Sequence, residues 1–228
     1  MANARTAGYG CRQTMTVGNT PATGGQSEFL VQGGAAPGAT VAIFKGSPVG
    51  MQTAAGGAGT LGFIMDQSAA TMTDGVTGGA TWTLAGGTNP SLGVFNGATF
   101  VDATGKPSWT NGLAAAQTSA IDYNTGNNNI TAFVNTNPDQ EYTVRADAAL
   151  TNASFNTLTN TGFNLNNVGA GKNGMSDSTL DLSGVATTGV ANYMWKIVRS
   201  ANVQSQTDFT VPGADVIVSY SNNAAAYK

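Results

Sequence analysis

The sequence predicts an all-β fold, an antiparallel β-sandwich or barrel with long glycine-rich loops and at most short helices. Short apolar runs of strand length recur along the chain, pairs of glycines separate them, and helical periodicity is scarce. Of the 31 glycines, 23 lie within residues 1–112. Glycine adopts the positive φ angles of tight turns at no steric cost, so the first half of the chain should be rich in corners and loops.

Nine segments have the length and the β-branched or aromatic residues that are typical of strands. They are residues 28–31, 40–44, 61–65, 81–84, 92–101, 130–135, 141–147, 193–199 and 216–220. In 141–147 the apolar Tyr142, Val144 and Ala146 alternate with polar side chains, which predicts a strand with one apolar and one polar face. The Asn-Pro-Asp run in 136–140 predicts a turn. We therefore expect the C-terminal half to form an antiparallel sheet.

The remaining local signals set the boundaries of the predicted regions. Residues 112–120 and 148–158 could each hold a short helix. The segment 211–213, Val-Pro-Gly, should bend or bulge the run that begins at Phe209, because proline cannot donate to a β-ladder. The predicted organisation is an N-terminal arm over 1–26, a glycine-rich β region over 27–112 and a C-terminal antiparallel β region over 113–228. Residues 27–228 can also form one domain.

The composition argues against most catalytic chemistry. The chain has no histidine, one cysteine and only 9% charged residues. The absence of histidine excludes Ser-His-Asp and Cys-His nucleophile systems and nearly all zinc sites. The motifs that resemble nucleotide or calcium loops, in 57–62, 169–173 and 122–129, lack the residues or the context that those ligands need. We expect no enzymatic activity, no cofactor and no metal site.

The charge distribution and the apolar runs also restrict the partners. The net charge is −3 and the basic residues are scattered from Arg5 to Lys228, so we expect no nucleic-acid partner. No apolar stretch approaches the length that a membrane-spanning helix needs, so we expect no membrane partner and synthesis in the cytoplasm. The lone Cys11 cannot form an internal disulfide. Packing, sheet hydrogen bonds or association with other chains must supply the stability.

A few aromatic and basic residues are candidates for contacts with other chains. Trp82 and Trp109 stand among small polar residues, which favours a contact surface, whereas Trp195 has the apolar neighbours of a core residue. The N-terminal arm is either a frayed terminus or a segment that orders against a neighbouring subunit. In the second case Arg5, Tyr9 and Arg12 would be its contact residues.

Several segments together resemble a known family. The runs GVFNGATFVD at 93–102, TGKPSW at 104–109 and NPDQEYTVRAD at 137–147 are similar to those of head decoration, or cement, proteins of tailed bacteriophage virions. The likeness continues through 178–182, 194–199 and 215–220 and covers about three fifths of the chain. It implies a β-rich, often oligomeric protein that binds the outer surface of the head shell and reinforces it.

The first functional hypothesis is therefore a structural protein of the virion that decorates and stabilises the capsid. Its partner would be the major capsid protein, its oligomer a trimer, and its location the capsid exterior after synthesis in the host cytoplasm. Arg5, Tyr9, Arg12, Trp82 and Trp109 are the candidate capsid or subunit contacts. The alternatives are a carbohydrate-binding or host-adhesion module on the virion, and a shell or tail-tube subunit.

Overall fold

A computed structural model describes about half of the chain, and the regular elements in it are all β-strands. The described residues are 7–16, 20–21, 25–31, 42–51, 63–66, 91–101, 104–113, 130–150, 162–166, 171–182, 195–201 and 208–220. The all-β prediction is confirmed for these residues. Where helices were expected at 112–120 and 148–158, Gly112–Leu113 forms a short strand, residues 148–150 are not helical, and 114–120 and 151–158 lie outside the described residues.

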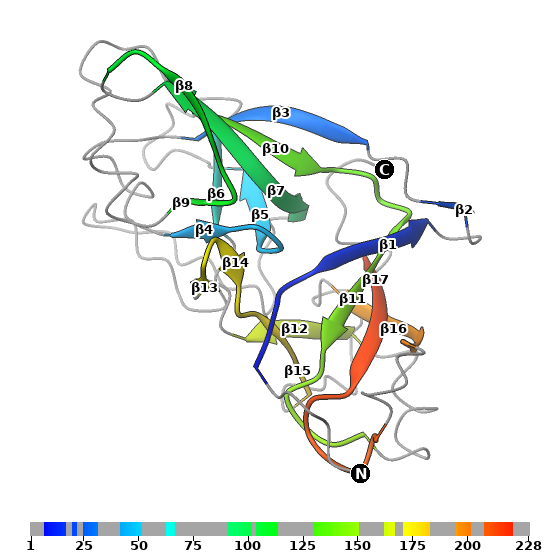
Figure 1. The fold of residues 1–228 in the computed structure, drawn as a ribbon. Helices are drawn as coiled ribbons and strands as arrows, with labels where there is room; N and C mark the ends of the chain where they lie inside the picture. The colour runs from blue at the N-terminus through cyan, green and yellow to red at the C-terminus, as the bar shows by residue number, and fades with distance from the viewer. Residues whose placement is uncertain are drawn as a thin grey trace, which may run out of the picture.

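The strands of the described residues fall into two larger sheets and two small pairs (Figure 1). In chain order they are β1 (Arg12–Thr16), β2 (Thr20–Pro21), β3 (Gln26–Val31), β4 (Ile43–Phe44), β5 (Pro48–Met51), β6 (Phe63–Asp66), β7 (Ser91–Val101), β8 (Pro107–Thr110), β9 (Gly112–Leu113), β10 (Thr131–Asn135), β11 (Gln140–Arg145), β12 (Gly162–Asn166), β13 (Gly171–Lys172), β14 (Met175–Ser176), β15 (Thr179–Asp181), β16 (Trp195–Ser200) and β17 (Asp215–Tyr220). Eight of the nine predicted strand segments overlap one of these strands, and the ninth, 81–84, lies outside the described residues.

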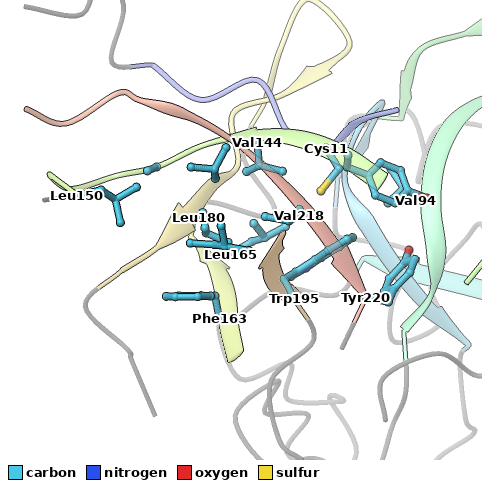
Figure 2. Packing of buried hydrophobic residues seen from close by; sticks show 14 residues of the cluster. Cys11, Val94, Val144, Leu150, Phe163, Leu165, Leu180, Trp195, Val218 and Tyr220 are labelled. Atoms are coloured by element: carbon cyan, nitrogen blue, oxygen red, sulfur yellow. The ribbon is translucent and has the colours of Figure 1, made fainter. Parts of the chain in front are cut away.

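The seven-stranded sheet has the order β15-β12-β16-β17-β11-β1-β2, with antiparallel pairing throughout. One hydrophobic cluster packs against it, with Trp195 and Phe163 fully buried (Figure 2). Trp195 stacks on Tyr220 at 4.6 Å between ring centroids and meets the edge of Tyr142 at 5.5 Å. The expectation that Trp195 belongs to the core is confirmed.

The two central strands of this sheet are buried on both faces. All six residues of β17 are buried, and in β11 the polar-face residues Glu141 and Arg145 are only 3% and 6% exposed. Both charges have partners: Arg145 Nε donates to Asp215 Oδ1 at 3.0 Å, and Arg199 Nη1 donates to Glu141 Oε1 at 2.9 Å. The predicted alternation therefore separates apolar from paired polar residues, and both faces of the strand are covered.

The six-stranded sheet curls around a second hydrophobic cluster. Its order is β10-β3-β6-β5-β7-β8, and β10 also pairs with β7, so the pairings of five strands run round a ring. The pairs are antiparallel except β3–β6, which is parallel. Ala98, Ala132 and Val134 face the cluster and are fully buried. This barrel-like sheet forms the upper part of Figure 1.

The predicted turn between β10 and β11 is confirmed, but it joins two sheets. Asn135 Oδ1 accepts a hydrogen bond from the backbone N–H of Asn137 at 3.1 Å, and Asn137 Oδ1 accepts one from Asp139 N–H at 3.0 Å. β10 then stays in the six-stranded sheet while β11 enters the seven-stranded one. The prediction that both strands share one antiparallel sheet is therefore wrong. The chain passes from the six-stranded to the seven-stranded sheet at 136–139.

The expected N-terminal arm supplies strands to the seven-stranded sheet. β1 pairs with β11, and β2 pairs with β1. Tyr9 and Cys11, just before β1, are buried, and Gly10 N–H donates to the carbonyl of Ser178 at 3.1 Å. Residues 7–16 thus pack within their own chain, because β1 pairs with β11 and β2 and the side chains of Tyr9 and Cys11 are buried.

A short segment around residue 45 connects the two sheets. Lys45 N–H lies within hydrogen-bond distance of the carbonyls of Asn111 (2.7 Å) and Gly174 (3.1 Å). The carbonyl of Gly46 accepts a hydrogen bond from Cys11 N–H at 2.9 Å, and Gly46 N–H donates one to the carbonyl of Phe95 at 2.9 Å. These backbone bonds link strands from both sheets at one place.

Candidate contact surface

The outer side of the six-stranded sheet carries an exposed apolar surface. Four side chains form it, and we call it the tryptophan face: Leu30, Val101, Trp109 and Phe133. Leu30, Val101 and Trp109 are 36%, 38% and 52% exposed, and Phe133 is half-buried. Large apolar side chains at this exposure are unusual when they gather on one side of a sheet, and such a patch indicates a contact surface.

Strand pairing places these residues on one side. Thr131 pairs with both Leu30 and Thr99, and Thr99 pairs with Trp109. Directly paired residues point to the same side of a sheet, and so do residues two positions apart. Phe133 and Val101 therefore join them, while the intervening residues face the inner cluster.

Trp109 is held firmly although half of it is exposed. Its ring lies over Gly97, where a methyl group would overlap the indole, and Gly97 has a φ of +142° at a break in the β7–β10 register. The ring centroid lies 5.4 Å from that of Phe133. Its Nε1 donates to Asn111 Oδ1 at 3.2 Å. A fixed indole loses little conformational entropy when a partner covers it, and tryptophans in such positions often dominate binding energy.

Two of the other predicted contact residues lie together at the N-terminal segment. The guanidinium carbon of Arg12 is 4.2 Å from the ring centroid of Tyr9, and that of Arg145 is 4.7 Å from the same centroid. The Tyr9 side chain is therefore enclosed between two cations of its own chain, and it is only 9% exposed. Arg12 is exposed. The structure brings Tyr9 and Arg12 together but places them beside the seven-stranded sheet, whereas Trp109 belongs to the other sheet.

Burial and a neighbouring carboxylate govern the electrostatics of Tyr9. Desolvation, and then the charge and hydrogen bond of Asp215, raise the pKa of Tyr9 well above its ordinary value. Asp215 also pairs with Arg145, whose Nη1 donates to the carbonyl of Ala7 at 2.7 Å. This network ties the N-terminal segment to β11 and β17, so Tyr9 serves packing inside the chain.

Arg5 and Trp82 lie outside the described residues. Sequence reasoning identified Trp109 but missed Phe133 and Gly97. The alternation in β10 carried a signal for Phe133, because Ala132 and Val134 on either side of it point inward. No local signal could have shown that Gly97 lies beneath an indole from the neighbouring strand.

The one cysteine of the chain, Cys11, is buried. Burial raises the pKa of the Cys11 thiol, which keeps it protonated and weakly nucleophilic. Within the described ranges, no three His, Cys, Asp or Glu side chains come together as metal ligands would. The same described residues contain no helix that is long and apolar enough to cross a membrane.

Comparisons with known proteins add no identity to this geometry. No family model, no curated protein and no solved structure matches the chain.

Proposed function

We propose that this protein is a structural component of a tailed bacteriophage virion that decorates the head and stabilises it. It would bind the outer surface of the major capsid protein lattice through the tryptophan face. The observation that carries the proposal is the fixed, half-exposed Trp109 among other exposed apolar side chains on one side of a curled sheet. The resemblance of residues 93–109 and 137–147 to cement proteins supports the choice of partner.

A decoration protein binds many equivalent sites on one capsid. A capsid presents the same surface many times, so a modest contact per copy reinforces the shell when it recurs over the lattice. Among the described residues that pair with the tryptophan face, Glu28, opposite Phe133, is charged and the others are uncharged. A surface of this kind loses little desolvation energy when another chain covers it. We further propose that the protein forms a homotrimer and has no catalytic activity.

The test is binding to heads that lack their own copy of the protein. Trp109→Ser should reduce the amount that sediments with heads by at least about tenfold, because a central tryptophan commonly contributes about 2 kcal/mol or more to an interface. Met15→Ser is the matched control: Met15 is 42% exposed but lies on β1 of the other sheet. It should bind heads like the wild type. Equal binding by Trp109→Ser and the wild type would end the proposal.

The same indole also favours a second candidate function, a carbohydrate-binding or host-adhesion module. Exposed tryptophans stack on the apolar faces of sugars. Trp109, however, lies on the outer side of the sheet, opposite the buried Ala98 and Ala132, whereas sugar sites are usually hollows. A glycan array decides: a signal that Trp109→Ser abolishes favours adhesion, and an empty array removes this alternative. Electron microscopy of the particle would separate decoration from a shell or tail-tube subunit by position.

A further inference from the structure

A partly open cavity of about 330 Å³ lies where the two sheets meet. Its walls come from β1, the segment around residue 45, β7, β10, β11 and β14, so both sheets contribute to it. The tryptophan face shares none of its four residues with this cavity. Its volume is at the lower end of the range of small-molecule sites, which is enough for a ligand of roughly ten non-hydrogen atoms.

Asn135, one of the lining side chains, has a hydrogen-bond donor without a partner. Asn135 is 3% exposed, and its Oδ1 is engaged by the N–H of Asn137 in the turn after β10. Because the atom that accepts this bond must be the amide oxygen, the bond assigns the positions of Oδ1 and Nδ2. The other end, Nδ2, is buried and has no hydrogen-bond partner. A buried donor without an acceptor is destabilising, so a ligand oxygen in contact with Nδ2 would be favoured; because Nδ2 has almost no accessible surface, that contact requires the Asn135 side chain to shift toward the cavity.

The charges of the lining residues have one sign. Arg12 and Lys45 line the cavity, and no acidic residue is among the described lining residues. Val94, Phe95 and Met175 provide apolar wall. The cavity therefore combines positive charge, an unpaired amide donor and apolar surface, which complements an anion attached to a short hydrocarbon stem.

We propose that this cavity binds a carboxylate on a short apolar stem, either a free small organic acid or a glutamate side chain presented by another chain. A carboxylate oxygen accepts the hydrogen bond from Asn135 Nδ2, and the basic residues neutralise the charge. Inorganic phosphate fits less well, because an ion without an apolar stem gains nothing from the apolar wall. The inference does not depend on the proposed role in a virion.

The test is titration of the full-length protein, followed by NMR or calorimetry, with four probes. Glutarate represents the free acid, and the blocked peptide acetyl-Gly-Gly-Glu-Gly-Gly-amide represents the presented side chain. Inorganic phosphate and the uncharged 1,5-pentanediol are the controls. We expect glutarate, the peptide or both to saturate with a Kd on the order of 1 mM, weakening as salt rises, and the two controls to bind at least about tenfold more weakly. Binding by glutarate alone assigns a metabolite, and binding by the peptide alone assigns a protein partner.

Isosteric variants locate the binding. Asn135→Asp keeps the Oδ1 acceptor of the turn but replaces the free donor with a negative charge, so it should weaken binding at least about tenfold. Asn137→Asp makes the same change in the same turn at a residue that does not line the cavity, and it should bind within about twofold of the wild type. Lys45→Gln should weaken binding severalfold, and Lys172→Gln, exposed on β13, should not.

The outcomes are exclusive. Loss of binding in Asn135→Asp and Lys45→Gln but not in their controls supports the proposal. If Asn135→Asp lacks the native circular dichroism spectrum, Lys45→Gln and the contrast between glutarate and pentanediol decide. Equal binding by all variants, equal binding by pentanediol, stronger binding by phosphate, or no binding of either carboxylate at about 10 mM would overturn the assignment.

Discussion

The two sheets use their polar and apolar residues in opposite ways. In the seven-stranded sheet, β17 is buried throughout, and charged residues such as Arg145 and Asp215 are paired inside the protein. In the six-stranded sheet, the inner side is buried, but the outer side leaves Trp109 and other apolar residues exposed. The seven-stranded sheet therefore pairs its charged residues in the interior, whereas the six-stranded sheet carries the exposed apolar surface that we propose binds a partner.

Removing the central tryptophan of the seven-stranded sheet should give the largest effect. Trp195→Ala deletes a fully buried ring that contacts Tyr142 and Tyr220, so the free energy of unfolding should fall by about 3–5 kcal/mol. Urea unfolding measures it. Trp109→Ala removes the same group from the exposed surface and should cost less than about 1 kcal/mol. Equal losses would contradict the division of roles between the sheets.

Breaking the buried ion pair should have the next largest effect. Asp215→Asn leaves Arg145 without its countercharge in a buried site, and the free energy of unfolding should fall by about 3 kcal/mol. Asp139→Asn makes the same substitution at an exposed turn position and should change it by less than about 0.5 kcal/mol. Urea unfolding of the two variants side by side would contradict this prediction if the losses were equal.

The seven-stranded sheet should also make the protein sensitive to alkali. Burial raises the pKa values of Cys11, Tyr9 and Tyr142 above their ordinary values of 9.0 and 10.0. Below pH 9 both states hold these protons, so the contribution is fully present. Above it the unfolded chain releases them first, so the free energy of unfolding should fall by roughly 2 kcal/mol between pH 9 and pH 10.

Urea unfolding at the two pH values measures this fall, and Cys11→Ala should remove about half of it. A fall of the same size in Cys11→Ala would show that other groups cause it.

A glycine pair gives the smallest effect and tests the surface of the six-stranded sheet. Gly97 and Gly105 both have positive φ angles, but only Gly97 lies under the Trp109 ring. Alanine should strain the backbone at both positions, and at Gly97 it should cost about 1 kcal/mol more, with a red-shifted tryptophan emission as the ring moves. Identical unfolding curves and emission spectra for the two variants would show that the ring does not rest on Gly97.

The sequence predicted strands better than it predicted sheets. The segments 130–135 and 141–147 and the turn between them were identified correctly, because alternation and turn residues are local signals. Their separation into two sheets was not, since alternation says which side chains share a face but not which strand lies alongside.

The missed strand β1 illustrates the second limit. Residues 12–16 are mostly exposed and lack apolar alternation, so only their pairing with β11 makes them a strand. The candidate surface likewise depends on pairings that local sequence does not reveal. Trp109 was recognisable from its polar neighbours, but Phe133 and Gly97 became relevant only through pairings between distant segments.

The pairing of β1 with β11 also limits the order in which the two sheets can form during translation. Gln13 and Gln140, joined by a side-chain hydrogen bond at 3.0 Å, stand 127 positions apart. At ribosomal speeds of about 5–20 residues per second, β1 waits roughly 6–25 s for its partner strand to be translated. Every strand of the six-stranded sheet is made during that interval. The barrel-like sheet can therefore close on the ribosome first, while β1 still has an unpaired edge on the side where β11 will pair.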